Sequence, residues 1–353
     1  MTPTSAPGGP SRARRSLTFL ASVMLALLSF EAILQNFCRD VRIPDPIFHT
    51  IFKPGSSIRE CSETCQTSHW TEGGVRGYEL PPEGTPRVLG LGDSFTEGVM
   101  VGDDEVWTAV LEERLHSRTK AAAVLNVGKP GFSVADYVYL ADALRERFRP
   151  RWTVIELRDS DLLADAWRKN FAVAHFVRAE DGSLSAVVDP FRDSAARTEL
   201  RKLRGRSSLI GYAFLRFMEF SEGMSNEPPL FRAAEANSTP CPQEVEYPIE
   251  QELDLLRERY DARLSLLYLP DTFDPHGPGA PSPIELRVMR YCQAHDMPLA
   301  DLRSRFEEFR QRRKSPLGFP SSSFNVGHMN ADGHRASGEI VAASLLETGR
   351  DFL

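Results

Sequence analysis

RVLGLGDSFTEG, from Arg87 to Gly98, begins as a short apolar strand and breaks abruptly at Gly92, Asp93 and Ser94. Glycine adopts backbone conformations that other residues avoid, so such a segment can turn sharply at the end of a strand and expose the side chain that it carries. Ser94 is therefore either an ordinary turn serine or a nucleophile presented at the end of a strand. The patterns around this segment distinguish between the two interpretations.

Short apolar runs alternate with amphipathic helical patterns along most of the chain after residue 86. This alternation predicts βαβ units and a parallel sheet. Because strands of nearly continuous apolar sequence are buried on both faces, helices should cover both sides of the sheet. We therefore predict a three-layer α/β/α domain of about five parallel strands over residues 87–353. The strands are expected at 87–93, 122–128, 152–158, 263–271 and 298–302, and the helices at 107–118, 134–148, 249–262, 281–296 and from Ala331 onward.

The alternation stops after Asp165 and resumes near residue 249, which predicts an insertion or lid at about 165–242. This segment begins with the pattern of a β-hairpin, whose turn is formed by residues 180–183. A basic amphipathic helix over 197–220 and a loop over 221–242 are expected to follow.

The N-terminus carries the features of an export signal. Residues 1–15 are rich in Pro, Gly, Ser and Arg and are expected to be disordered. Residues 16–37 contain an apolar run that is just long enough to cross a membrane, for which a helix needs about 20 residues. We predict an uncleaved signal anchor that passes once through the cell membrane, with the rest of the chain in the periplasm or outside the cell. A cleaved signal peptide is the alternative, and the protein would then be secreted.

Residues 38–86 are polar and irregular, with Gly and Pro throughout, and we predict a linker that becomes an N-terminal flap against the domain. Cys61 and Cys65 within this segment are close enough in sequence to form a disulfide in an oxidising compartment. Three further cysteines cannot all pair with one another, so at least one of them is left over, and free thiols are the alternative for all three: Cys38, Cys241 and Cys292.

Charge and residue spacing exclude several functions. A net charge of −7 with dispersed arginines gives no basic surface for nucleic acid. No two cysteines have CxxC spacing, and His328 and His334 do not have a common metal-ligand spacing, so no metal or other cofactor is predicted. The acidic segment 101–107 lacks the spacing of a calcium loop and is interpreted as the cap of the helix that follows it.

Polar or glycine-rich segments follow three of the predicted strands, at the edge where open α/β sheets bind their ligands. Ser94 follows the first strand. Gly128 and Gly131 follow the second strand and can bring bare backbone N–H groups close to a ligand. Ser160 and Asp161 follow the third strand, where Asp159 and Asp161 are expected to fix the loop. A catalytic site at this edge would combine Ser94 with these donors.

The base that an activated serine requires is expected to be a histidine. His328 lies in the loop before the last predicted helix, for which Asn330 would be the N-cap. His334 lies inside that helix and is expected to be packed or exposed rather than catalytic. Ser94 and His328 are therefore the predicted nucleophile and base.

Four segments together resemble the SGNH/GDSL hydrolase superfamily: GDSFTEG, NVGKPGFS, RDSDLL and NVGHMNADGH. The segment HWTEGGVRGYEL ahead of them is similar to the leader of membrane-tethered bacterial members. The resemblance implies a flavodoxin-like domain in which Ser94 is the nucleophile and also an oxyanion donor. It further implies Gly131 and Ser160 as oxyanion donors and His328 as the base. Asn325 stands where the family has the aspartate that orients this histidine.

The resemblance covers about residues 87–161 and 325–347, with two departures from the family pattern. Ser160 replaces an asparagine and has a shorter reach to an oxyanion, while Asn325 can orient His328 but brings no negative charge. The implied function is a serine esterase or deacylase that hydrolyses acyl esters, above all acetyl esters, of a small molecule or glycan at the cell envelope. The alternatives are an O-acyltransferase acting on an envelope polysaccharide and a catalytically impaired binding protein of the same fold.

Overall fold

The computed structural model describes residues 12–37, 42–45, 47–61, 63–71, 73–77, 79–117, 122–167, 173–188, 247–277, 279–320 and 325–347. The chain divides into two units, residues 45–192 with 245–353 and residues 1–44 with 193–244, which are considered separately. The basic helix and the loop expected over 197–242, together with Cys38 and Cys241, lie outside the described residues.

Five parallel strands form the central sheet of the larger unit, in the order β11-β10-β7-β5-β6. The middle strand β7 is buried along its whole length, because its apolar residues meet helices on both faces. The predicted three-layer α/β/α fold is therefore confirmed. The strands are β5 (Arg87–Leu91), β6 (Ala123–Asn126), β7 (Trp152–Leu157), β10 (Leu264–Tyr268) and β11 (Leu299–Asp301).

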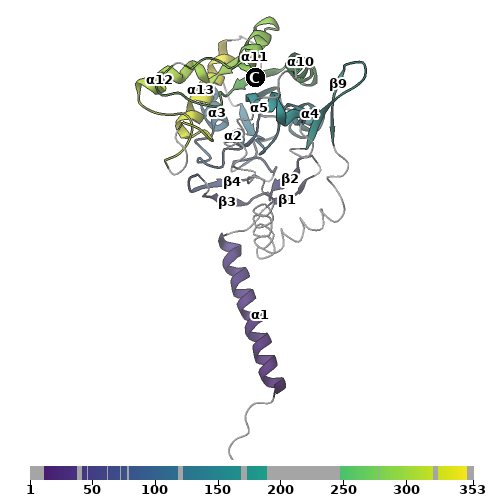
Figure 1. The fold of residues 1–353 in the computed structure, drawn as a ribbon, viewed down its shortest axis with the longest axis vertical. Coiled ribbons are helices and arrows are strands. Elements are labelled where there is room, and N and C mark those ends of the chain that lie inside the picture. Colours follow the sequence, from purple (N-terminus) through teal and green to yellow (C-terminus); the bar gives the residue numbers. More distant parts are fainter. Residues whose placement is uncertain are drawn as a thin grey trace, which may run out of the picture. The chain divides into compact units, whose positions relative to one another are not determined.

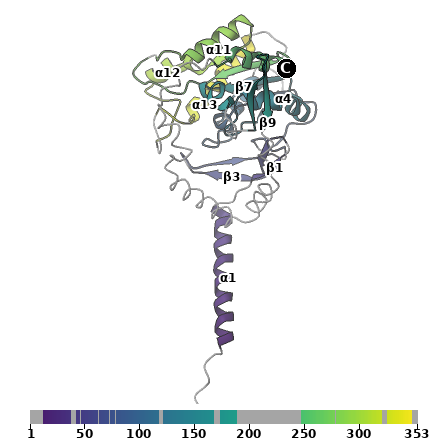
Figure 2. The ribbon, with the colours of Figure 1, turned by 45° about the vertical axis from the view of Figure 1, so that its right-hand side comes forward.

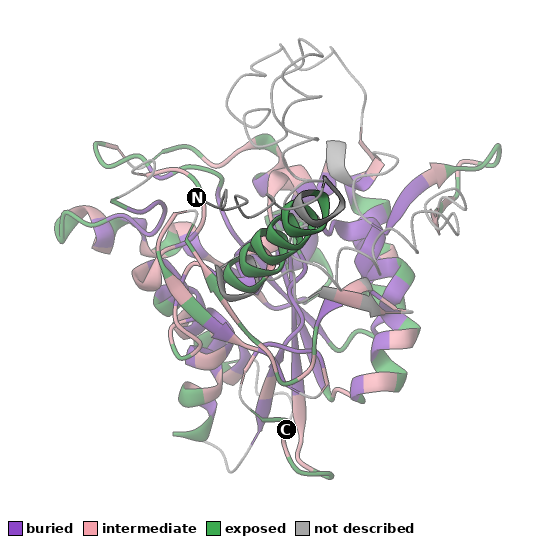
Figure 3. Ribbon diagram, turned by 90° about the horizontal axis from the view of Figure 1, so that it is seen from below, coloured by how far each residue is buried: buried purple, intermediate pink, exposed green. Residues whose placement is uncertain are grey.

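Helices cover both faces of this sheet (Figure 1). On one face, Trp107 and Phe306 join strand residues such as Val154 in a single buried core. On the other face α10 packs against α4 and α11. Figure 3 shows strands that are largely purple, for buried, between helices in which buried purple residues alternate with pink and green ones. The first face carries α3 (Trp107–His116), α12 (Phe306–Gln311) and α13 (Ala331–Glu347), and the second α4 (Val134–Phe148), α10 (Ile249–Arg259) and α11 (Pro283–Ala294).

Local signals set the ends of these helices. Ser133 and Asp136 form a capping box at the start of α4, in which the Asp136 carboxylate accepts a 2.9 Å hydrogen bond from the Ser133 backbone N–H. Ser282 caps α11, which has Pro283 in its first turn. Among the described residues, five short helices were not predicted from the sequence: α12 and the single turns α2 (Ser94–Glu97), α5 (Asp159–Leu162), α6 (Ala164–Trp167) and η2 (Leu302–Arg305).

Two antiparallel hairpins lie outside the central sheet. The hairpin predicted around residues 180–183 is confirmed, with β8 (Ala174–Arg178) paired to β9 (Leu184–Val188). The segment predicted as an irregular flap instead contains strands β2 (His49–Phe52), β3 (Ser57–Glu60) and β4 (Gln66–His69), of which β3 and β4 form a hairpin (Figure 2). A further short strand, β1, spans Arg42–Asp45.

The N-terminal helix α1 (Arg12–Phe37) belongs to the smaller unit, and its large apolar side chains between Leu17 and Ile33 are exposed. Its segment Ser16–Ile33 is long and apolar enough to cross a membrane. A signal peptide has the same length and composition, so this helix is compatible with both of the N-terminal segments considered above.

Candidate active site

Ser94 lies at the carboxyl end of β5, as the first residue of the short helix α2. Asp93 caps this helix, and its side chain accepts a 2.7 Å hydrogen bond from the Phe95 backbone N–H. Gly98 ends the helix in the left-handed conformation that glycine adopts without strain, with φ 61°. The amide of Ser94 is at a position that has no partner within its own helix and can be donated to a ligand.

The turn that carries Ser94 packs directly against the loop after β6. A Cβ atom added to Gly128 would lie 2.1 Å from the backbone nitrogen of Glu97, so only glycine fits there. The Asn126 side chain donates a 2.7 Å hydrogen bond to the Thr96 carbonyl and accepts one of 3.0 Å from the Gly128 N–H. These contacts fix the position of the serine relative to the sheet.

His328 is brought to Ser94 from the other end of the chain. Its Nε2 lies 2.9 Å from the Ser94 Oγ, within hydrogen-bond distance. The ring of Phe95 packs against the imidazole, with 4.9 Å between the ring centroids. The Gly318 N–H donates a 2.8 Å hydrogen bond to the His328 carbonyl, which holds the backbone of this loop. The pair of side chains is therefore arranged for proton transfer from the hydroxyl to the imidazole.

The helix that follows has the predicted cap. Asn330 Oδ1 accepts a 3.1 Å hydrogen bond from the Gly333 N–H at the start of α13. His334 lies within α13, is 1% exposed, and accepts a 3.3 Å hydrogen bond from the Trp107 N–H at its Nδ1. Burial lowers the pKa of His334 to about 3, so this histidine is neutral and structural.

Glu63, not Asn325, is the hydrogen-bond partner of His328 Nδ1. Asn325 has a left-handed backbone, with φ 70°, and its carbonyl accepts a 3.2 Å hydrogen bond from the Phe273 N–H. Its side-chain oxygen is buried and has no hydrogen-bond partner among the described residues. The expected orienting role of Asn325 is therefore corrected, because a carboxylate far away in the sequence occupies that position.

The two other candidate oxyanion donors lie on either side of Ser94. Gly131, with φ 74°, is in the loop after β6, and Ser160 is in the first turn of α5 directly after β7. Since β5 lies between β6 and β7, both loops flank the loop of the serine at the same edge of the sheet. Asp159 and Asp161 fix this region as expected: Asp159 accepts hydrogen bonds from Tyr268 and Ser282, and Asp161 accepts one of 2.9 Å from the Arg158 N–H.

Acidic side chains are concentrated beneath the serine. Glu156 is fully buried, and burial raises its pKa well above the normal value, with a further increase from the nearby charges of Asp93 and Asp161. Burial alone would lower the pKa of Arg158, but the carboxylates of Asp271, Asp93 and Asp161 raise it overall. Arg158 is thus the cation that compensates this acidic group. Within the described ranges, no three His, Cys, Asp or Glu side chains are grouped so that they could hold a metal ion.

No protein-family model and no curated protein matches this chain, whereas solved structures do. The crystal structure of TesA is 13% identical, with a TM-score of 0.37, over 74% of this chain and 99% of that chain. A member of the lipolytic protein G-D-S-L family from Veillonella parvula is 12% identical, with a TM-score of 0.34, over 74% and 96%. The acetyl xylan esterase AlAXEase is 11% identical, with a TM-score of 0.38, over 74% and 98%. Because one fold supports many activities, a function for this chain has to be argued from its own residues.

Proposed function

We propose that this protein is a serine ester hydrolase in which Ser94 is the nucleophile and His328 is the general base. The observation that carries the proposal is the 2.9 Å contact between Ser94 Oγ and His328 Nε2. A serine hydroxyl is a weak nucleophile unless an adjacent base removes its proton, and this contact supplies the base. The position of Ser94 at the carboxyl end of a central parallel strand gives the second support, because ligands of such sheets bind there.

In the proposed reaction, Ser94 Oγ attacks the ester carbonyl while its proton passes to His328 Nε2. The tetrahedral oxyanion accepts hydrogen bonds from the backbone N–H groups of Ser94 and Gly131, and a weaker one from the Ser160 hydroxyl. His328 then returns the proton to the leaving alcohol, which leaves an acyl group on Ser94. Water, activated by the same histidine, releases the acid and restores the serine.

The proposed substrates are acyl esters, above all acetyl esters, of a small molecule or glycan at the cell envelope. The apolar helix α1 supports attachment to the membrane or export through it. The disulfide between Cys61 and Cys65 supports an oxidising compartment for the larger unit. A reporter fused to the C-terminus that is active only in the cytoplasm would contradict this location.

Labelling with a fluorophosphonate tests the activated serine without requiring the natural substrate. The purified protein should become labelled at Ser94 and should hydrolyse p-nitrophenyl acetate. Ser94→Ala should abolish both signals, and His328→Ala should reduce both. A wild-type protein that takes no label, and hydrolyses the ester no faster than Ser94→Ala, would refute the hydrolase proposal.

A further inference from the structure

The carboxylate that contacts His328 comes from a loop closed by a disulfide, outside the central sheet. We propose that Glu63 is the positioning residue of this site and that the Cys61–Cys65 disulfide must be closed for Glu63 to hold His328 in its working orientation. This inference rests on the proposed function of the Ser94–His328 pair.

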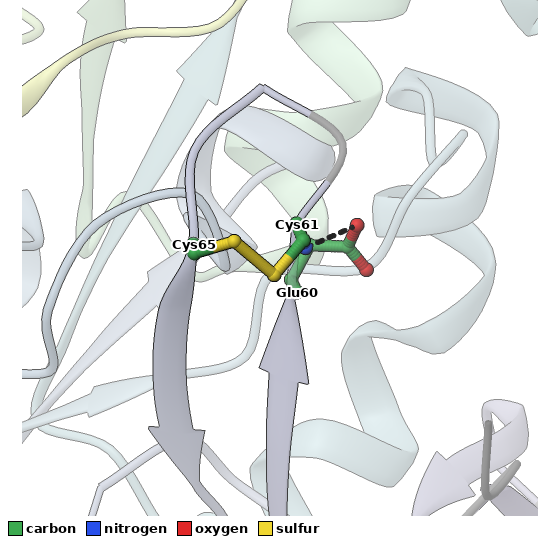
Figure 4. The surroundings of a disulfide bond; sticks show 3 residues. All are labelled: Glu60, Cys61 and Cys65. Atoms are coloured by element: carbon green, nitrogen blue, oxygen red, sulfur yellow. Dashed lines mark hydrogen bonds between the residues drawn. A yellow bond between two sulfur atoms is a disulfide. The ribbon is translucent and has the colours of Figure 1, made fainter. Parts of the chain in front are cut away.

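The disulfide fixes the loop at the tip of a hairpin. Strands β3 and β4 pair up to Glu60 and Gln66, and Cys61 directly follows β3 while Cys65 directly precedes β4. Figure 4 shows the bond joining the two strand ends across the loop. The cysteines are four positions apart in the sequence, so the loop that contains Glu63 has few accessible conformations while the bond is intact.

The base of the same hairpin is anchored beside the nucleophile. Trp70, directly after β4, is 2% exposed and stacks on Phe52 with 4.2 Å between ring centroids. Asp103 accepts a 2.9 Å hydrogen bond from Arg76 Nε and lies 2.6 Å from His69 Nδ1. Arg76 also donates a 2.7 Å hydrogen bond to the carbonyl of Glu97, in the helix that begins with Ser94. The hairpin therefore has a fixed base at the nucleophile and a tip at the histidine.

Contacts at the tip place the carboxylate closely against the histidine loop. The side chains of Glu63 and His328 are 19% and 24% exposed, so their contact is largely removed from solvent. Gly327, which precedes His328, has φ 90°, and a Cβ atom added to it would lie 3.5 Å from Glu63 Oε2. A partly buried carboxylate has a stronger electrostatic interaction with an imidazolium than an exposed one, because less water screens it.

This geometry gives Glu63 a defined effect on the reaction. A carboxylate at Nδ1 holds the proton on that nitrogen, so that Nε2 is free to accept the proton of Ser94. It also stabilises the imidazolium that forms when the proton arrives. Asn325 does not provide this charge, and Glu63 does so from a segment that precedes the first strand of the sheet.

Opening the disulfide should release this constraint. Dithiothreitol would break the Sγ–Sγ bond and donate two electrons and two protons, which gives two thiols and cyclic oxidised dithiothreitol. The base of the hairpin, held by Trp70 and Arg76, contains no cysteine and should stay folded. A disulfide that closes a short loop also stabilises a protein less than one that closes a long loop. Reduction should therefore change the position of Glu63 without unfolding the domain.

Substitutions at Glu63 test its positioning role. Glu63→Gln should lower kcat on p-nitrophenyl acetate by about 10³- to 10⁴-fold with little change in KM. Glu63→Asp should retain part of the activity. Added formate should partly restore Glu63→Ala, because a small carboxylate can enter the vacated space, whereas a purely structural residue would show no such rescue. Wild-type kcat in Glu63→Gln, with Ser94→Ala inactive, would overturn this inference and leave the proposed function intact.

Reduction tests the disulfide. Dithiothreitol should lower kcat/KM by up to about 10²-fold, the effect expected for a displacement of about 1 Å at an active site. The double variant Cys61→Ser, Cys65→Ser should have the activity of the reduced wild type and no sensitivity to dithiothreitol. Cys292→Ala, which removes a buried free thiol, is the matched control and should remain sensitive. Full activity in the double variant, with an unchanged circular dichroism spectrum in both proteins, would refute the requirement for the disulfide.

Discussion

The guanidinium carbon of Arg158 lies 4.1 Å from the centre of the Phe95 ring, so a cation covers the residue that follows the candidate nucleophile. The same arginine forms an ion pair with Asp271 and lies near the buried acidic side chains of Asp93, Asp161 and Glu156. Its side chain is 19% exposed, which means that water contributes little to balancing these charges. Arg158 therefore stabilises the region next to Ser94 as the counter-ion of these acidic side chains.

Removing that charge should destabilise the protein. Arg158→Met keeps an unbranched apolar stem but leaves the carboxylates without their cation, and it should lower the free energy of unfolding by about 3–5 kcal/mol at pH 7. Arg158→Lys retains the charge without the planar fork and should lose less. Urea unfolding of the three proteins provides the measurement. Equal stability of Arg158→Met and wild type would show that the carboxylates are neutral without the arginine.

Asn325→Asp should not accelerate the reaction, although it restores the residue of the family pattern. His328 Nδ1 already contacts Glu63, so a new carboxylate would have no proton to accept there. Since the Asn325 side-chain oxygen is buried and has no hydrogen-bond partner in the described part of the chain, an aspartate should instead cost about 1–3 kcal/mol of stability. Hydrolysis rates and thermal unfolding of Asn325→Asp and wild type provide the test. A clear gain in kcat would mean that the residue at position 325 faces the histidine during the reaction.

Glu252 should make the protein less stable as the pH rises. Its side chain is fully buried, and burial raises its pKa from 4.5 to about 8. The Trp167 hydrogen bond and the charge on Arg287 oppose this rise, and the charge on Glu250 adds to it. The contribution of protonated Glu252 to the free energy of unfolding is fully present below pH 4.5, and it is lost as the pH rises through about 8.

Glu252→Gln should remove this dependence. Each unit of pKa shift corresponds to about 1.4 kcal/mol, so the variant should gain up to several kcal/mol over wild type above pH 8 and little below pH 4.5. Urea unfolding across this pH range measures the difference. Parallel pH curves for the two proteins would contradict the assignment.

Gly128→Ala should disturb the turn of the nucleophile. The new Cβ would lie 2.1 Å from the Glu97 nitrogen, and backbone cannot move aside as a flexible side chain can. We expect a loss of about 1–3 kcal/mol in stability together with lower fluorophosphonate labelling. Gly84→Ala is the comparison, because Gly84 has open space around it and φ 86°, so its substitution adds backbone strain without crowding, whereas Gly128→Ala adds crowding at a position without positive φ. If both variants label like wild type, the close approach at Gly128 does not fix the serine.

The sheet and its main helices could be predicted because their signals are local. The amphipathic pattern of residues 134–148 gave both ends of α4, and the apolar runs gave all five strands of the sheet to within a few residues. Ser94 and His328 also carried local signals, since each lies at a boundary between a loop and a regular element.

The hairpin and its carboxylate could not be predicted in the same way. Glu63 and His328 are 265 residues apart, and no periodicity links two positions at that distance. The signal that was present, one cysteine on each side of Glu63, indicated a closed loop but not that the loop contacts His328. The acidic segment before α3 was predicted wrongly, because its contacts are also distant in the sequence. Asp103 does not cap the helix, whose N-cap is Val106, but binds His69 at the end of the hairpin and Arg76 after it.

Because this hairpin precedes the first strand of the sheet, its position limits where a shortened version of the protein can begin. Arg87 begins the first strand of the sheet, and a fragment from there to the C-terminus contains every strand and helix of the three layers. Such a fragment would carry Ser94 and His328 without Glu63, and without the tryptophan and arginine that hold the hairpin base. Fusions and minimal fragments of this protein should therefore begin before residue 45, where the larger unit itself begins.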